Sequence, residues 1–365
     1  MSRISSFTIQ GFRGIKELSV ENLNLINLIV GDNNTGKTSI LEAIQLLRNP
    51  LELINAIRVS KCRDVATLSS GISSYENFIL MFPKDENNLS LGVSAVCDNS
   101  ELSCKIKGET SKIYIDSNEY NAFFHRNLKN SDGIANTESE QFVGVIYCNC
   151  FGKEIHNNVC LNSLERVSGM PIKKNECMKV TYVSPVGHLQ GGIIGQIVKN
   201  IEYKEVCVKA LQLFDPDIED ILFVKGINNH PVDCIRHKTL GLMPVSMYGD
   251  GIKQVLTLAN AVAKSNGGII LIDEIETALH KKYYDDIFRF IVKICRRFEV
   301  QAFITTHSIE AVDGLLATQD YGIQKTEDEI SVITLKREKA KTYARVMSGR
   351  DVSQNREDFG FEVRL

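Results

Sequence analysis

Residues 31–38 read GDNNTGKT, a complete match to the phosphate-binding loop pattern G-x-x-x-x-G-K-[ST]. Residues 25–30 before them read LINLIV, an apolar run typical of a buried strand. Residues 39–47 after them read SILEAIQLL, with apolar residues at helical spacing. Between a strand and a helix, such a loop binds polyphosphate, because backbone N–H groups and the positive helix end surround the phosphates. The stretch therefore predicts a nucleoside triphosphate site.

The chemistry of this loop assigns roles to individual side chains. We expect Lys37 to reach the terminal phosphates and the Thr38 hydroxyl to ligate Mg²⁺. The nucleotide contacts expected from the loop and the start of the helix are Gly31, Asn33, Asn34, Thr35, Gly36, Lys37, Thr38 and Ser39.

Two carboxylates follow a second apolar strand. Residues 268–272 read GIILI and lead directly into Asp273 and Glu274. At the C-terminal edge of a strand beside the phosphate loop, Asp273 is placed to hold Mg²⁺ through water. Glu274 is then placed to orient and polarise the attacking water. A solvated acidic turn is the alternative, and the apolar lead-in argues against it.

A histidine ends the next predicted strand. Residues 303–308 read FITTHS, so His307 follows an apolar run in the part of the chain after Asp273 and Glu274. A histidine there can hydrogen-bond the terminal phosphate or the attacking water. A lone histidine is more often structural, but this placement favours a catalytic role for His307.

A second glycine motif opens another predicted helix. Residues 248–253 read YGDGIK and lead into the helix predicted over 254–263. Glycines at a helix start form an anion-binding terminus, and two such termini can scarcely serve one nucleotide within one core. Gly249, Asp250 and Gly251 are therefore expected to bind a nucleotide held by another subunit. An ordinary glycine turn is the alternative.

The bulk properties exclude several classes. The chain has 365 residues, a net charge of −3 and a pI near 6.2, so contact with nucleic acid would need a local basic patch. No run approaches the ~20 apolar residues that span a bilayer, and the first residues lack a signal-peptide apolar segment. We expect a cytoplasmic protein without a membrane partner, with its ten cysteines mostly reduced.

One group of metal-ligand residues needs weighing. Cys148, Cys150, His156 and Cys160 lie close together in sequence and offer zinc ligands. However, the C-x-C spacing falls in the predicted strand 141–150, and no C-x-x-C pair is present there. We interpret these cysteines as small core hydrophobes.

The remaining pattern predicts alternating strands and helices. Period-two alternation predicts an antiparallel meander of strands over 89–97, 102–107, 112–115 and 141–150, with turn signals at 98–100 and 108–109. Residues 118–140 read as a polar loop anchored by Phe123 and Phe124. Helix is predicted around 188–214 and over 283–298, with buried strands at 268–272 and 300–305.

These motifs, in this order, resemble the ATP-binding-cassette group of ATPases. More narrowly they resemble the OLD-type and RecF/SMC-like ATPases, whose I-x-x-F-R start is similar to residues 4–14 here. The Asn33-Asn34 pair, Asp273 to Glu276 followed by Leu279-His280, residues 305–308 and the ending GFEVR at 360–364 all look like the OLD-type branch. The resemblance is strong at both ends of the chain and weak over 50–180.

The resemblance implies a fold and a mode of action. The fold is α/β, a P-loop NTPase of the ABC/SMC-head type, with a mixed central sheet, an antiparallel β-meander lobe and a helical subdomain. The cofactors are ATP and Mg²⁺, with Arg13 of the opening motif among the nucleotide contacts. Two subunits meet head to head, as a homodimer or higher oligomer, and sandwich two ATPs. Gly249 stands where cassette proteins usually have a serine, and the glutamine-bearing loop is not identifiable.

As a domain plan, we expect one ATPase domain over 1–365 with four parts. The N-terminal strands and phosphate loop occupy 1–50, and an inserted meander and helical region occupies 51–182. The helical segment, signature, Walker B carboxylates and histidine switch occupy 183–320, and a strand and helix extension occupies 321–365.

Three tasks compete for such an ATPase. The first is a sensor ATPase of an anti-phage defence system, acting with a separate effector such as a nuclease or toxin, since the 58 residues after His307 are too few for a nuclease domain. The second is a RecF-like repair ATPase that binds DNA through the basic run 336–341, although such a run is usually a solvated face. The third is an ATP-gated scaffold with little turnover, which the presence of Glu274 argues against.

Overall fold

The computed structural model describes residues 3–63, 72–84, 88–115, 137–165, 176–189, 194–198, 200–225, 230–321, 328–339 and 341–363. Three sheets organise these residues: two of six strands and one of three. None of the described helices is long and apolar enough to cross a membrane.

The central sheet is mixed and carries the phosphate loop at its middle. Its order is β15-β14-β3-β13-β12-β8, and every neighbouring pair is parallel except the antiparallel β14–β15 pair at one edge. The strands are β3 (Ile26–Gly31), β8 (Val180–Val183), β12 (Ile269–Ile272), β13 (Gln301–Thr305), β14 (Ile330–Glu338) and β15 (Lys341–Ser348). The parallel strands end at one edge of the sheet, where the predicted catalytic residues follow them.

Strand β3 shows how this sheet divides two hydrophobic cores. Leu28 and Val30 pack into the core on one face, and Ile29 between them packs into the core on the other. All six residues of β3 are buried, because both faces of the sheet are covered.

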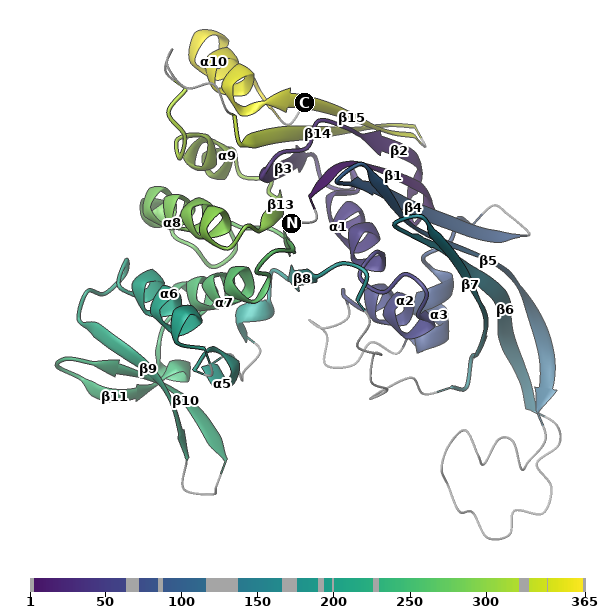
Figure 1. The fold of residues 1–365 in the computed structure, drawn as a ribbon, viewed down its shortest axis with the longest axis horizontal. Coiled ribbons are helices and arrows are strands. Elements are labelled where there is room, and N and C mark those ends of the chain that lie inside the picture. The colour runs from purple at the N-terminus through teal and green to yellow at the C-terminus, as the bar shows by residue number, and fades with distance from the viewer. Residues whose placement is uncertain are drawn as a thin grey trace.

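The second large sheet is an antiparallel meander, and helix α1 lies between it and the central sheet (Figure 1). Its order is β2-β1-β4-β5-β6-β7. The strands are β1 (Ile4–Phe12), β2 (Ile15–Val20), β4 (Leu89–Cys97), β5 (Ser100–Ile115), β6 (Thr137–Cys150) and β7 (Lys153–Asn162). The helices on this side are α1 (Lys37–Leu46), α2 (Leu53–Ser60) and α3 (Ser74–Ile79).

The turn predicted at 108–109 is wrong, because β5 runs unbroken from Ser100 to Ile115. Gly108 pairs with Gly144 of β6, and the ring of Phe142 covers both. A Cβ on Gly108 would lie 2.5 Å from the Phe142 ring, and one on Gly144 would lie 2.7 Å from it. These glycines therefore make room for an aromatic ring. Of the predicted loop 118–140, residues 137–140 belong to β6, and Phe123 and Phe124 lie outside the described residues.

Helices cover the other face of the central sheet (Figure 1). They are α5 (Ile194–Ile197), α6 (Ile201–Leu211), α7 (Asp250–Lys264), α8 (Tyr284–Arg297), α9 (Ile309–Leu316) and α10 (Gly349–Phe359), with 3₁₀ turns η2 (Gly187–Leu189), η3 (Val245–Met247) and η4 (Lys281–Tyr283). The single helix predicted around 188–214 is wrong. Asn200 begins a new helix there, since its side chain caps α6 by accepting from Tyr203 N–H at 3.2 Å.

The small third sheet extends from this helical side. Its order is β11-β10-β9, and its strands are β9 (Ile218–Lys225), β10 (Pro231–His237) and β11 (Gly241–Pro244). The pairs are antiparallel. Figure 1 shows this sheet at the far end of the helical half from the meander.

Candidate active site

The phosphate loop joins β3 to α1 through backbone conformations that favour glycine. Gly31 has φ 143° and Gly36 has φ 104°, and Asn34 between them has φ 63°. At Gly31 a Cβ would also lie 2.4 Å from the carbonyl oxygen of Leu335 on β14. Two features therefore require glycine at position 31: its positive φ, and the close approach of the neighbouring strand β14, which leaves no room for a Cβ.

Lys37 is folded back over the loop. Its Nζ donates to the carbonyl oxygens of Gly31 at 2.7 Å and Asp32 at 2.9 Å. Burial lowers the pKa of Lys37, and the negative charges of Glu274 and Asp273 partly oppose that shift. A triphosphate bound in the loop would supply the anionic partner that favours the charged lysine.

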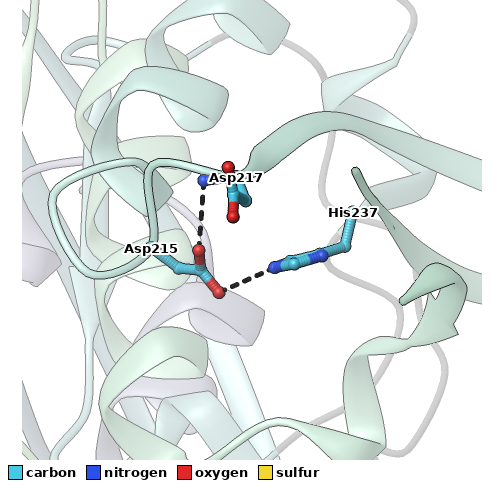
Figure 2. Close-up of side chains that lie close together, drawn as sticks. All are labelled: Asp215, Asp217 and His237. Atoms are coloured by element: carbon cyan, nitrogen blue, oxygen red, sulfur yellow. Dashed lines mark hydrogen bonds and ion pairs between the residues drawn. The ribbon is translucent and has the colours of Figure 1, made fainter. Parts of the chain in front are cut away.

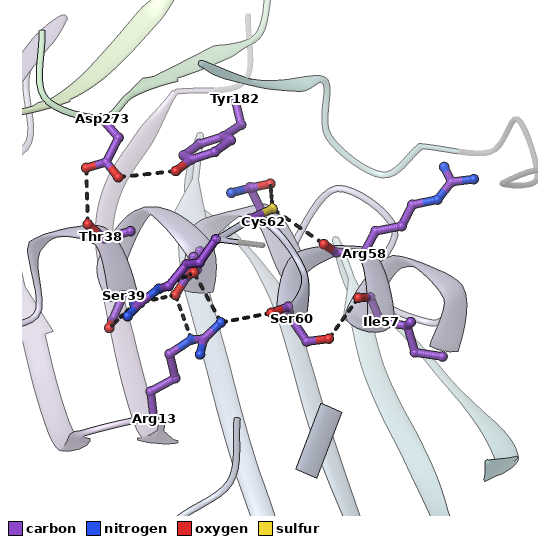
Figure 3. A network of polar contacts seen from close by, with 12 residues as sticks. Arg13, Thr38, Ser39, Ile57, Arg58, Ser60, Cys62, Tyr182 and Asp273 are labelled. Carbon is purple, nitrogen blue, oxygen red and sulfur yellow. Dashed lines mark hydrogen bonds and ion pairs between the residues drawn. The ribbon is translucent and has the colours of Figure 1, made fainter. Parts of the chain in front are cut away.

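Asp273 is a buried carboxylate that accepts hydrogen bonds from three hydroxyl groups. Thr38 and Thr305 donate to its Oδ1 at 3.2 and 2.6 Å, and Tyr182 donates to its Oδ2 at 3.2 Å. Figure 3 shows Thr38 and Tyr182 reaching Asp273 from two sides. A hydroxyl and a carboxylate side by side form the oxygen-rich donor set that suits Mg²⁺. Thr38 and Asp273 would hold the ion, which would neutralise phosphate charge when bound.

Glu274 and His307 lie together at the end of the same strands. Glu274 has φ 50°, and its N–H donates to Thr305 Oγ1 at 2.9 Å, which fixes the strained backbone beside Asp273. Its side chain is 42% exposed. His307 Nδ1 lies 3.9 Å from Glu274 Oε1 and 3.4 Å from Glu276 Oε1. This geometry leaves Glu274 accessible to a water molecule and gives it a histidine neighbour.

A pocket of about 880 Å³ opens over the loop. Of the predicted site residues, those that line it are Arg13, Asn33, Asn34, Thr35, Gly36, Lys37, Thr38, Ser39 and Glu274. Those that do not are Gly31, Asp273, His307, Gly249, Asp250 and Gly251. Gly31 and Asp273 still contact lining residues directly, whereas the glycine motif before α7 is absent from the lining.

Arg13 reaches the pocket wall but is engaged within the protein. Its Nε lies 2.7 Å from Glu42 Oε2, and its Nη2 donates to the Ser60 carbonyl oxygen at 3.2 Å (Figure 3). Glu42 is fully buried on α1, and Arg63 donates to both of its oxygens at 2.8 Å. Arg63 also donates to Ser39 at 3.0 Å and lines the pocket.

Sequence reasoning missed Arg63, Tyr182 and Arg337. Arg337 was placed in a basic run, yet it lines the pocket and donates to the Asn34 carbonyl oxygen at 3.3 Å. Arg63 and Tyr182 lie in segments without a motif, and only the fold brings them to the loop. The exposed charge pattern was the one available signal for Arg337.

The glycine motif begins α7 as predicted, with Gly249 at the N-cap position. Among the described residues, a Cβ on Gly249 would meet nothing within 4 Å, and Gly249 is exposed. Asp250 pairs with Lys253 at 3.0 Å, in the first turn. The helix end is thus accessible to a second molecule.

A cluster of Asp215, Asp217 and His237 offers three metal-ligand atoms within 4.8 Å of one another (Figure 2). His237 Nδ1 accepts from the N–H groups of Thr239 and Leu240, both at 3.2 Å. The ring proton therefore sits on Nε2, which donates to Asp215 at 3.0 Å. The hydrogen bond between His237 and Asp215 thus joins β10 to the turn before β9.

The cysteine group considered for zinc is split by the strand pleat. Cys148 is buried, whereas His156 pairs with Tyr147 on the opposite face of the same sheet. Cys150 lies with its Sγ 3.0 Å from that of Cys177, and Cys160 is exposed. The four residues therefore form no common site, although Cys160 is not the core residue that we expected.

Comparison with known proteins shows which kind of domain the chain contains. A family model described as AAA ATPase domain matches residues 3–235, and one described as AAA domain, putative AbiEii toxin, Type IV TA system matches residues 203–313. An "ATP/GTP phosphatase" of Helicobacter pylori is 24% identical over 345 residues, 88% of this chain and 90% of that protein. The DNA replication and repair protein RecF of Pseudoalteromonas translucida is 32% identical over 111 residues, 30% of this chain and 28% of that protein.

Among solved structures, an SMC head bound to the C-winged helix domain of ScpA aligns with 96% of this chain and 99% of its own. The TM-score is 0.51 at 13% sequence identity, so the likeness concerns the fold. The predicted fold class, an α/β P-loop fold of the ABC/SMC-head type, is confirmed.

Proposed function

This chain belongs to the family of AAA ATPase domains and is an ATPase, and we propose that it works as a dimeric switch driven by ATP binding and hydrolysis. In this proposal, Lys37 and the loop hold the triphosphate, Thr38 and Asp273 hold Mg²⁺, and Glu274 orients the water. His307 contacts the γ-phosphate or that water.

The observation that carries the dimer is the position of the glycine motif. Gly249, Asp250 and Gly251 begin α7 with an open helix end, and they do not line the pocket of their own subunit. A helix N-terminus attracts phosphate through its N–H groups and its dipole. We propose that it meets the nucleotide of a second copy, so that each reaction centre is built from two chains.

Mixing two inactive variants tests this composite site. Glu274→Gln removes the base, and Gly249→Leu places a bulky side chain at the open helix end, where an added Cβ meets nothing within 4 Å among the described residues. Each variant alone is expected to be nearly inactive. Mixed dimers contain one complete site, so an equimolar mixture should recover about a quarter of the parent ATPase rate. A mixture no faster than its components would refute the composite site.

The finer assignment is a sensor ATPase of an OLD-like anti-phage defence system, acting in the cytoplasm with a separate effector. Its support is the sequence resemblance of residues 273–280 and 305–308, together with the match of residues 203–313 to a family described by a putative toxin. ATP-bound dimers would hold the effector, a nuclease or toxin, and hydrolysis would release it.

Purification from the native host tests the partner. The Glu274→Gln variant held in ATP should retain the effector, and the same variant in ADP should lose it. Recovery of this chain alone in both nucleotide states contradicts a separate effector.

The RecF match favours a second candidate, an ATPase that binds DNA. The basic run supports it less than its sequence suggests, because Lys336 pairs with Glu338 at 3.4 Å and Arg337 faces the nucleotide pocket. Duplex binding that requires ATP and weakens steeply with salt would establish this candidate.

A further inference from the structure

Tyr182 donates a hydrogen bond to the carboxylate oxygen of Asp273 that neither Thr38 nor Thr305 contacts by a hydrogen bond. Thr38 and Thr305 both donate to Oδ1. The Tyr182 hydroxyl donates to Oδ2 at 3.2 Å, and Figure 3 shows Thr38 and Tyr182 on either side of the carboxylate. A hydroxyl that donates to a carboxylate makes a stronger hydrogen bond than a neutral pair does. Both oxygens of the carboxylate are therefore oriented, each from a different side.

The three donors come from different parts of the fold. Thr38 belongs to the phosphate loop, and Thr305 ends β13, the strand that also fixes Glu274. Tyr182 comes from β8, the edge strand beside β12. Burial raises the pKa of Tyr182, and the charge of Asp273 adds to the shift, so the phenol keeps the proton that it donates.

Strand β8 also leads to α7, the helix that the glycine motif begins. The backbone N–H of Asp273 donates to the Val183 carbonyl oxygen at 3.0 Å, so the carboxylate is tied to β8 by main chain and side chain. A few residues further on, η2 packs on α7, where a Cβ on Gly187 would lie 4.0 Å from Thr257 Cγ2. In Figure 1, β8 lies between the half that holds α1 and the half that holds α7.

We propose that Tyr182 is a positioning residue that orients Asp273 for Mg²⁺ and ties it to the β8–η2 connection, so that metal and nucleotide at the loop set the position of α7. This inference rests on the proposed Mg²⁺ site at Thr38 and Asp273. It adds to the switch a route within one subunit from the phosphate loop to the surface that meets the second copy.

Tyr182→Phe tests the positioning role, because it removes the hydroxyl and keeps the ring. Binding of a fluorescent ATP analogue is titrated with Mg²⁺ at a protein concentration too low for dimers. Loss of a partner that orients a metal ligand typically weakens metal binding 10–100-fold, so half-maximal binding should need about tenfold more Mg²⁺ or above. Affinity measured in EDTA should be unchanged, since the phenol donates its hydrogen bond to Asp273, which lies outside the loop.

The matched control is Tyr321→Phe, because the Tyr321 hydroxyl is buried and has no hydrogen-bond partner among the described residues. This control should leave the Mg²⁺ dependence at the parent value. An unchanged Mg²⁺ dependence in Tyr182→Phe, with a parent-like melting temperature, overturns the positioning role. Because the assay reads monomers, it stands apart from failure of the dimer proposal.

Hydrogen exchange tests the connection to α7. In the parent, Mg²⁺ with a non-hydrolysable ATP analogue should slow exchange over residues 183–189 and at the start of α7. In Tyr182→Phe at saturating Mg²⁺, that protection should be reduced while protection of the phosphate loop persists. Equal protection of 183–189 in both proteins, or none in the parent, overturns the connection.

Discussion

Replacing Glu42 by Gln should destabilise this protein far more than replacing an exposed glutamate. Glu42 is fully buried on α1 and receives two guanidinium groups, Arg13 at 2.7 Å and Arg63 at 2.8 Å. Arg13 has a side chain only 15% exposed, so it would be left as a buried cation without its carboxylate. Removing one member of a buried pair costs about 3–5 kcal/mol.

The estimate for Glu42→Gln falls at the low end of that range, about 3 kcal/mol. Arg63 is 47% exposed, so water screens its share, and the new amide oxygen still accepts one hydrogen bond. Part of the effect should reach the active site, since Arg63 also donates to Ser39 of the nucleotide pocket. ATP affinity should therefore fall along with the free energy of unfolding.

Urea unfolding followed by circular dichroism measures this loss. The control is Glu202→Gln, because Glu202 pairs with Arg297 at 2.9 Å with both side chains nearly half exposed. Such surface pairs contribute about 0–1 kcal/mol, so the control should stay near the parent. If the two variants lose the same free energy of unfolding, the buried-pair argument is refuted.

Three further outcomes follow from the geometry of the loop. ATP affinity should fall as the pH rises through the lowered pKa of Lys37, because the neutral amine no longer attracts the negatively charged phosphates. If the affinity for an ATP analogue is the same from pH 7 to pH 10, this prediction is contradicted. Gly31→Ala should abolish ATP binding and lower the melting temperature, since its Cβ would lie 2.4 Å from the Leu335 oxygen; an alanine variant that binds ATP like the parent shows that the strands move apart. Thr305→Val should slow turnover about tenfold or more, because it removes the hydroxyl that donates to Asp273 and accepts from the Glu274 N–H. A parent-like rate in a phosphate-release assay would show that this hydroxyl does not position the two carboxylates.

The local motifs carried most of what the sequence could predict. An apolar run followed by polar residues marks three places in the sequence: the phosphate loop, the strand before Asp273 and the strand before His307. The fold class follows from these runs, because parallel strands bring their ends to one edge. The structure places the loop, Asp273, Glu274 and His307 at that edge.

The errors concern features that depend on pairing between distant residues. Gly108 looked like a turn because its partner, Gly144, and the ring of Phe142 are known only once β5 and β6 are in register. The run after 188 looked like one helix because its apolar residues keep helical spacing across several short elements. Local spacing does not report such breaks.

The missed site residues have a common cause in the order of the strands. Strand β3 has β13 on one side and β14 on the other, so Arg337 near the end of β14 arrives at Asn34 from a distant part of the chain. Strand β8 has only four residues, too few for a pattern, yet its place beside β12 brings Tyr182 to Asp273.

The edge of a parallel sheet thus explains the site as a whole. The polar residues Asp273 and Thr305 lie where β12 and β13 end, and Tyr182 is the last residue but one of β8. Because these strands run side by side, Tyr182 and Thr305 both donate to the carboxylate of Asp273, at 3.2 and 2.6 Å, so that the three strands are joined at one side chain. In our proposal, the state of the phosphate loop passes along this sheet edge to β8. Of these three strands, β8 alone continues into η2 beside α7, and this is where the proposed signal leaves the site.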